Sequence, residues 1–449
     1  MNLVRLAKGP VARRLISGFG ANMLGKIWAL LIQLLSVPVL TVAWGGGGYG
    51  VWLMISTVPT FIALSDFGLG TAAGVDMTRS ISRSDTEGAL RAYQSVWVFL
   101  TLVTGAVCGT AVAGALIWGY AFPASEPGAA FTHQEIALTA AICIAYAFVS
   151  MQTGIQRIVF QATNKYAFGT FLYDIWFLIG GLGVIAAAWC GRGIVSAALA
   201  LLISRVIGNV VTSVLLRRSE PWARQGWRHA DRATLRRLMQ PSMAALSLTL
   251  ANSFGLQGVV LTVGWFLGPV AAATFGTCRM LTRIPLQLSG LVTRASLPEL
   301  IRAQAADNAS LTRRLMQINI GLSVAAVAPI VTVLTIFGNT ILARISHGKL
   351  HASVAVFALL GAGAVLSAAW SSLGSLLMAE NRQGSYGYLA LIVYLASAAT
   401  PFVFRADLTP TLLVLCGAEV VILLRVVQAT AKFGRAAAAT VGKSMINAN

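Results

Sequence analysis

The chain has 449 residues, of which 57% are hydrophobic and only 10% are charged. A soluble protein carries about 25% charged residues, so the composition excludes a soluble globular protein. The formal net charge of +19 does not indicate nucleic-acid binding, because the basic residues gather in every second loop between apolar runs, as they do in membrane proteins.

The apolar residues come in runs of about 20 or more, the length that a membrane-spanning helix needs. We therefore expect an all-α integral membrane protein with about 12 transmembrane helices. The first run follows a basic segment and is too long for the apolar part of a signal peptide, so we expect it to be retained. In chain order the expected spans are approximately 17–43, 49–75, 93–118, 135–160, 169–190, 194–216, 241–266, 269–294, 314–338, 352–378, 385–404 and 410–430.

The loops between the spans differ in charge. An even number of spans puts both termini on one side of the membrane, and basic loops lie mainly on the cytoplasmic side. One set, which includes both termini, carries Arg79, Arg83, Arg91, Lys165, the run from Arg217 to Arg237, Arg302, Arg313, Arg314 and Arg382, whereas the other carries only Arg192, Arg344, Lys349 and Arg405. Both termini are therefore expected to be cytoplasmic.

The long polar segment 217–240 divides the chain into a first lobe (1–216) and a second lobe (241–430), followed by a cytoplasmic tail (431–449). Its arginines alternate with Trp222, Trp227, Leu235 and Leu238. Two compatible interpretations stay open. In one, the segment is an amphipathic helix that contacts anionic lipid of the inner leaflet. In the other, it is a linker between the lobes that sets the topology.

Short motifs recur in the same order in the two lobes. Thr41-Val42-Ala43-Trp44 ends the first span and Thr262-Val263-Gly264-Trp265 ends the seventh. Pro59 precedes Leu64-Ser65 as Pro285 precedes Leu288-Ser289, and Ala162-Thr163-Asn164-Lys165 matches Ala379-Glu380-Asn381-Arg382. The repetition predicts two pseudo-symmetric six-helix lobes. Transporters built in this way bind their substrate between repeats and rock them.

A stripe of polar residues interrupts the apolar run 269–294. At about 100° per residue, Arg279, Arg283, Gln287 and Arg294 share one helical face. A charge at bilayer depth costs at least about 2.5–3.5 kcal/mol and usually faces protein or water. We therefore predict that the stripe binds an anionic substrate, although Arg294 is near a span end and has snorkelling as an alternative.

Other intramembrane polar residues extend this prediction. Further candidates for substrate binding are Asn22, Lys26, Arg157 and Arg205, and candidates for ion coupling are Asp66, Asp174 and Glu419. The alternatives are that Lys26 pairs with Asp66, that Arg157 snorkels, and that Asp174 is interfacial. The five cysteines and four histidines lack metal-site spacing, so we expect neither a metal nor a cofactor.

Several motifs resemble those of a known family. They are Ser17-Gly18-Phe19-Gly20-Ala21-Asn22, Tyr49-Gly50-Val51-Trp52, Leu64-Ser65-Asp66-Phe67-Gly68-Leu69-Gly70 and Asn164-Lys165. The chain resembles the polysaccharide transporters (Wzx-type oligosaccharide flippases) of the multidrug/oligosaccharidyl-lipid/polysaccharide exporter superfamily. The resemblance implies a MATE-like fold, alternating access and a cationic cavity, for which Arg279, Arg283 and Lys26 are equivalents by chemistry.

The resemblance also implies a function. The substrate would be undecaprenyl-pyrophosphate-linked oligosaccharide, moved from the cytoplasmic to the periplasmic leaflet of the bacterial inner membrane beside a polymerase and glycosyltransferases. Coupling to the membrane potential, H⁺ or Na⁺ stays open. The alternatives are a cation-coupled multidrug exporter, which would use the carboxylates, and a membrane scaffold of a polysaccharide synthesis complex.

Overall fold

A computed structural model describes residues 10–122, 129–305, 309–379, 384–404 and 407–446, and in parts of these ranges, including 294–305, it describes the backbone alone. This part of the chain is helical and contains no strand. Its contacts form two compact units, Met1–Leu246 and Ser247–Asn449, called here unit 1 and unit 2. The expected all-α class is confirmed.

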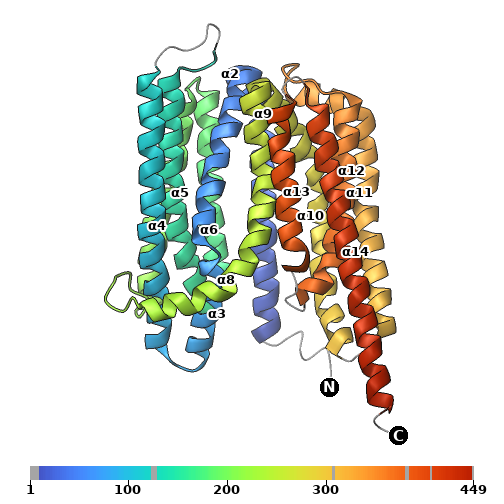
Figure 1. Ribbon diagram of the computed structural model, residues 1–449. Helices are drawn as coiled ribbons and strands as arrows, with labels where there is room; N and C mark the ends of the chain where they lie inside the picture. The colour runs from blue at the N-terminus through green and yellow to red at the C-terminus, as the bar shows by residue number, and fades with distance from the viewer. Residues whose placement is uncertain (1–9, 123–128, 306–308, 380–383, 405–406, 447–449) are drawn as a thin grey trace. The chain divides into compact units, whose positions relative to one another are not determined.

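Unit 1 contains helices α2 to α7 and most of α8 (Figure 1). The bounds are α2 Pro10–Ala63, the 3-10 turn η1 Leu64–Asp66, α3 Leu69–Ser82, α4 Thr86–Ala121, α5 His133–Ala162, α6 Tyr166–Trp189, α7 Ile194–Ser219 and α8 Arg232–Ser253. In unit 2 they are the π-helix η2 Phe254–Gly258, α9 Val259–Leu267, α10 Pro269–Ala305, α11 Ala309–Ile345, α12 Val354–Ala379, α13 Gly384–Val403 and α14 Thr409–Ile446.

Ten helical segments of the described residues are long and apolar enough to span a membrane. The first of them, Gly20–Asp66, is broken at Gly45, which gives two segments of spanning length. The arginine-bearing helix α10 is not among the ten, so its expected passage through the membrane stays a prediction.

The structure adds three local features that the expected spans do not contain. The second span does not continue to residue 75, because Phe67 and Gly68 adopt left-handed backbone conformations between η1 and α3. A π-helix interrupts the seventh span. The linker does not form one amphipathic helix, since residues 220–231 are turns and bends and only the part from Arg232 is helical.

The two units repeat one packing pattern. In unit 1, α2 packs on α6, α3 on α4 and α5, α4 on α5, and α7 on both α5 and α6. In unit 2, α9 packs on α13, α10 on α11 and α12, α11 on α12, and α14 on both α12 and α13. Most packing pairs of unit 1 therefore have a counterpart in unit 2, as the predicted repeat requires, whereas the α2–α5 and α5–α6 contacts have none.

A glycine with positive φ separates the first two spans of each repeat. Gly45 has φ 71° and ψ 177°, and Gly268 has φ 96° and ψ 163°. Side-chain-bearing residues adopt this region at a cost of about 1–3 kcal/mol. The two hairpin turns therefore require glycine.

We expect Gly45→Ala and Gly268→Ala each to destabilise the protein by about 1–3 kcal/mol. Thermal unfolding in detergent measures the effect. Gly109→Ala is the matched control, because Gly109 lies within α4 with open space around it and alanine favours a helix by about 0.5–1 kcal/mol. An equal loss of stability in all three variants would contradict the strain argument.

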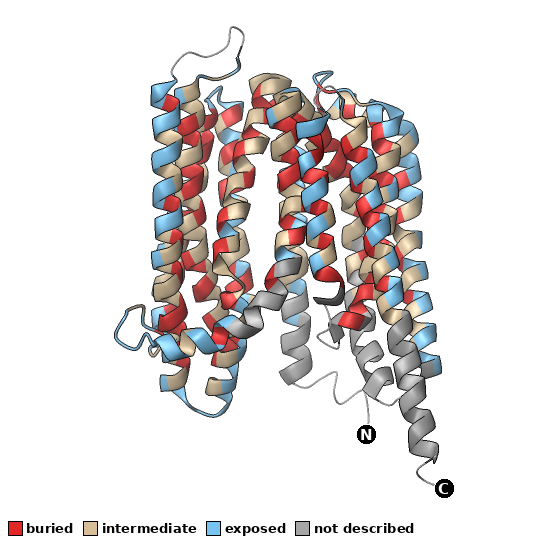
Figure 2. Ribbon diagram, in the orientation of Figure 1, coloured by how far each residue is buried: buried red, intermediate tan, exposed pale blue. Residues whose placement is uncertain are grey.

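The buried core of unit 1 lies where α3, α4 and α5 meet, and includes Met77, Tyr93 and Phe160. Figure 2 shows buried residues along the inner sides of these helices and exposed residues along the outer side of α4. The outer side is apolar: Leu102 is 67% exposed and Ile117 is 68% exposed. Exposed apolar faces of this extent are those that a bilayer covers.

Candidate functional site in unit 1 and its counterpart in unit 2

A cavity of about 790 Å³ opens among the helices of unit 1. Its wall comes from the second half of α2, η1, α3, α4, α5 and α6. The polar lining residues are Thr60, Asp66, Thr71, Thr78, Arg79, Tyr146, Ser150, Arg157, Gln161 and Tyr173. The volume is in the range of small-molecule binding pockets, and the lining mixes cations, hydroxyl groups and aromatic rings.

Two arginines flank one of these rings. The guanidinium carbon of Arg157 lies 4.9 Å from the ring centroid of Tyr173, and that of Arg205 lies 4.4 Å from the same centroid. Arg205 also lies 5.4 Å from the ring of Tyr146 and donates a hydrogen bond of 3.2 Å to its hydroxyl. α5, α6 and α7 thus assemble a cation–aromatic cluster, two of whose rings line the cavity.

Arg205 has unused donors. Its side chain is almost fully buried, with 1% exposure, and its Nε and Nη1 atoms have no hydrogen-bond partner among the described residues. A buried donor without a partner costs about 1–3 kcal/mol, and more when the group is charged. Such a guanidinium, beside a cavity, is suited to an anion that accepts from it.

Asp174, one helical residue on from Tyr173, contributes negative charge to the same region. Its carboxylate packs on α2 so closely that a Cβ added to Gly25 would lie 2.0 Å from Asp174 Oδ2. Asp174 is not in an ion pair among the described residues. Gly25 therefore leaves the space that the Asp174 side chain occupies. The sequence did not reveal this contact, since nothing in the local pattern of Gly25 distinguishes it from other helical glycines.

Asp66 lines the cavity but has a local partner. Its Oδ1 accepts a hydrogen bond of 2.9 Å from the backbone N–H of Gly70, at the start of α3. The alternative pairing with Lys26 is not among the three described ion pairs, which are Arg91–Glu87, Lys165–Glu220 and Arg237–Asp76. Asp66 therefore accepts a hydrogen bond from the first turn of α3.

Asn22 is joined to α6 rather than to the cluster. Its side-chain amide exchanges hydrogen bonds with the hydroxyl of Tyr166, at 2.9 and 3.1 Å. Lys26 is half-buried on the same helix. Neither residue lines the 790 Å³ cavity, so their predicted contact with substrate stays a prediction.

The guanidinium of Arg279, in unit 2, donates hydrogen bonds to backbone carbonyl groups. Arg279 is 6% exposed, its Nη1 donates to the carbonyl of Leu256 at 2.9 Å, and its Nη2 donates to the carbonyl of Gly255. Both carbonyls belong to the π-helix η2, in which regular α-helical hydrogen bonds are interrupted. The guanidinium thus satisfies backbone acceptors of a bent span.

Arg279 and Arg283 share a small pocket with Glu419 of α14. Glu419 is 4% exposed and accepts hydrogen bonds from Trp370 Nε1 at 2.6 Å and from the Tyr394 hydroxyl at 2.9 Å. The pocket volume of about 20 Å³ is close to the space of one water molecule. In this conformation it has no room for a pyrophosphate.

The remaining residues of the predicted stripe add little. Gln287 is half-buried on α10, and the side chain of Arg294 lies outside the described residues. Arg279 and Arg283 lie beside the carboxylate of Glu419, which is on another helix. The periodicity of α10 alone could not reveal this contact.

The buried charges of the two units occupy corresponding helices with opposite sign. In unit 1, Tyr146 of α5 and Tyr173 of α6 contact Arg205 of α7. In unit 2, Trp370 of α12 and Tyr394 of α13 contact Glu419 of α14. The charged residues were singled out in the sequence, but the four aromatic partners were missed because each is an ordinary residue within an apolar span.

Comparison with known proteins assigns the chain to a family. The family model described as "Polysaccharide biosynthesis protein" matches residues 15–304. The chain belongs to this family of polysaccharide biosynthesis proteins. The family and the fold are those of MOP superfamily transporters and not those of enzymes. This member of the family is therefore a multi-pass membrane transporter.

Solved structures share its fold. An inward-facing multidrug resistance MATE transporter of the MOP superfamily superposes with a TM-score of 0.67 at 15% identity, over 95% of this chain and 99% of the other. Its outward-facing counterpart gives 0.63 at 16% identity, over 98% and 99%. A Pyrococcus furiosus MOP superfamily transporter, whose binding pocket is described as having reverse polarity, gives 0.51 at 14% identity, over 92% and 96%. Comparison with curated protein sequences gives no match.

Proposed function

We propose that the protein is a flippase that moves undecaprenyl-pyrophosphate-linked oligosaccharide from the cytoplasmic to the periplasmic leaflet of the bacterial inner membrane. The observation that carries this proposal is the cation–aromatic cluster at the unit 1 cavity, in which Arg205 keeps two buried donors without a partner. An anionic head group would supply the missing acceptors.

The chemistry of the cavity fits both parts of such a head group. Guanidinium groups bind phosphate oxygens with paired N–H donors, which assigns Arg157, a lining residue of the cavity, to the pyrophosphate. Arg205 does not line the cavity, so its buried donors would reach the anion only after Tyr146 or Tyr173 moved aside. Hydroxyl and amide side chains, such as those of Thr78, Ser150 and Gln161, exchange hydrogen bonds with sugar hydroxyls. A cavity of about 790 Å³ holds a head group with its first sugars, while a longer glycan and the lipid chain would extend beyond it.

Carboxylates on both units are suited to coupling transport to an ion gradient. Asp66 lines the unit 1 cavity, Asp174 lies beside the cation–aromatic cluster, and Glu419 lies beside Arg279 and Arg283. Protonation of any one of them changes the local charge balance around a bound anion. We propose Glu419 as the first carboxylate to test, because it is buried and accepts hydrogen bonds from Trp370 and Tyr394.

Reconstituted protein tests the proposal. In vesicles that contain the protein and a fluorescent undecaprenyl-pyrophosphate oligosaccharide, the oligosaccharide is expected to become accessible to a membrane-impermeant glycan-modifying enzyme. Arg157→Gln is expected to lower the rate of this translocation at least tenfold. Arg192→Gln, which removes an exposed loop charge, is the matched control. Unchanged translocation by Arg157→Gln would reject the assigned site, and translocation by no form of the protein would reject the flippase.

The presence of Asp66 in the cavity keeps a cation-coupled drug exporter as the second candidate. That function predicts efflux of a cationic dye that Asp66→Asn abolishes and Arg157→Gln spares. Measuring both cargoes with both variants separates the two candidates.

A further inference from the structure

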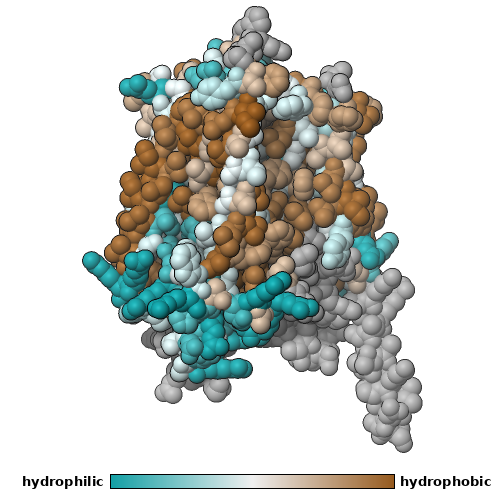
Figure 3. Space-filling model, turned by 60° about the vertical axis from the view of Figure 1, so that its left-hand side comes forward, coloured by the Kyte–Doolittle hydropathy of each residue, from teal (hydrophilic) through white to brown (hydrophobic). Residues whose placement is uncertain are grey.

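We infer that the inner end of unit 1 is a preformed docking platform for anionic phospholipid. The platform consists of the linker 220–231, the first turns of α8, the end of α7 and the α3–α4 turn. Its exposed basic residues are Arg79, Arg83, Arg217, Arg218, Arg224, Arg228, Arg232 and Arg236. In Figure 3 hydrophilic side chains gather in a band at the foot of the apolar helical wall.

Side-chain hydrogen bonds fix the linker against α4. Gln94 donates to the carbonyl of Arg224 at 2.9 Å and accepts from the backbone N–H of His229 at 2.8 Å. Ser95 accepts from the N–H of Asp231 at 2.8 Å. Both anchoring side chains are buried, with 4% and 3% exposure. A linker that only joined two lobes would not need these contacts.

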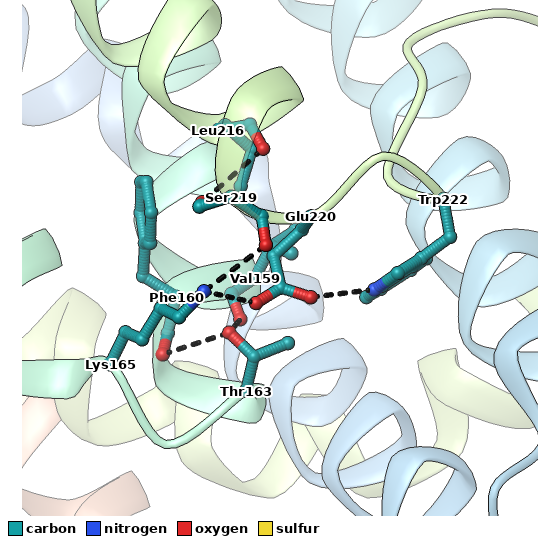
Figure 4. Close-up of polar contacts among 8 residues, drawn as sticks. All are labelled: Val159, Phe160, Thr163, Lys165, Leu216, Ser219, Glu220 and Trp222. Atoms are coloured by element: carbon teal, nitrogen blue, oxygen red, sulfur yellow. Dashed lines mark hydrogen bonds and ion pairs between the residues drawn. The ribbon is translucent and has the colours of Figure 1, made fainter.

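A second anchor lies where α7 ends. Lys165 donates to Glu220 at 2.7 Å and to the carbonyl of Ser219 at 3.1 Å, and Glu220 accepts from Trp222 Nε1 at 3.0 Å (Figure 4). Trp222 packs against the buried core with Ala223. Trp222 and Ala223 are thus taken into unit 1, and the arginines of the linker are left on the surface.

The charges of the platform are largely uncompensated. The described ion pairs here join Arg237 to Asp76, Arg91 to Glu87 and Lys165 to Glu220. The eight exposed arginines of the platform are therefore in no described ion pair. Hydrogen bonds from the backbone and hydroxyl of Thr234, which Asp231 accepts as the cap of α8, hold the pKa of Asp231 below its usual value. The surplus of positive charge complements anionic head groups.

Trp227 places this surface at the depth of the head groups. It is 79% exposed although the loop around it is fixed, and Trp189, at the other end of the α6–α7 pair, is also 79% exposed. α7 has 26 residues, or about 39 Å at 1.5 Å per residue, against a hydrocarbon core of about 30 Å. Exposed tryptophans at both ends of such a span mark the two membrane interfaces.

The platform adjoins the cavity, because Arg79 belongs to both. Bound phospholipid would therefore lie next to the cavity entrance on the α3 side. The inference concerns the bilayer lipid rather than the transported one, and its test does not depend on transport.

Native mass spectrometry of the full chain from micelles that contain equal phosphatidylglycerol and phosphatidylcholine tests the inference. The wild-type protein is expected to retain phosphatidylglycerol preferentially. The variant R224Q/R228Q/R232Q is expected to bind it on the order of 100-fold more weakly, since each basic residue near an anionic surface contributes about fivefold. Trp227→Ala is expected to weaken retention and Trp227→Phe to restore part of it.

The matched control R192Q/R344Q/K349Q removes the same charge from exposed positions in other loops and is expected to retain phosphatidylglycerol as the wild type does. Equal retention by the two triple variants would overturn the inference. So would a wild-type protein with no preference between the lipids, a result that would leave an acidic protein as the partner of this surface.

Discussion

Replacing Arg205 with methionine is expected to lower transport of the lipid-linked sugar about 10- to 100-fold without lowering the melting temperature. The loss corresponds to one charged hydrogen bond, about 1.5–3 kcal/mol. Stability should hold or rise, because the buried guanidinium leaves Nε and Nη1 without partners, and apolar replacements of buried charges are often neutral or stabilising. Vesicle translocation and thermal unfolding measure the two effects.

Tyr146→Phe provides the comparison for Arg205. It keeps the ring that lies 5.4 Å from the guanidinium and removes the hydroxyl that accepts the 3.2 Å hydrogen bond. We expect a smaller decrease in transport, because the guanidinium is less firmly positioned but still charged. A fall in melting temperature of Arg205→Met with transport intact would assign Arg205 a structural role.

Replacing Arg279 with glutamine is expected to have the opposite pattern, with a large loss of stability. The substitution leaves the carbonyls of Gly255 and Leu256 without their charged donors. At about 1.5–3 kcal/mol for each such bond, the protein should lose roughly 3–6 kcal/mol. Glu419 would also lose a neighbouring positive charge at a buried site.

Arg283→Gln is the matched control for Arg279→Gln. Arg283 lies one helical turn further along the same face, is only half-buried, and lines the same pocket. We expect Arg283→Gln to cost much less stability. Thermal unfolding in detergent and the yield of folded protein compare the two variants. An equal loss of stability in both would contradict a stabilising role for the hydrogen bonds from Arg279 to the π-helix.

The sequence revealed the helical class, the repeat and the positions of most buried charges, because these follow from run lengths, motif order and the cost of charge in lipid. It did not reveal how the charges pair. Arg279 was predicted to bind substrate because it is deep in the expected span 269–294, which contains no acid, yet Glu419 of another helix lies beside it in unit 2. Such contacts depend on which helices pack together, and one-helix periodicity does not contain that information.

Local backbone features were also beyond the sequence. The left-handed residues Phe67 and Gly68 end a span that hydropathy continues to residue 75. The π-helix at Phe254–Gly258 has no proline nearer in the chain than Pro241 and Pro269. Hydropathy averages over such breaks. The ordered linker was missed for another reason, because its hydrogen bonds to Gln94 and Ser95 join positions far apart in the chain.

The bonds of Arg279 to η2 have a thermodynamic consequence. Nη1 and Nη2 each donate one N–H to a backbone carbonyl, so an anion that takes these same N–H groups must displace those carbonyls. Anion affinity and the π-to-α equilibrium of the seventh span are then linked functions. The coupling is reciprocal: if a bound anion favours a regular α-helix at this position, then a regular α-helix there tightens anion binding by the same free energy. Amide hydrogen exchange at residues 254–258 would register that coupling as a change in protection on adding ligand.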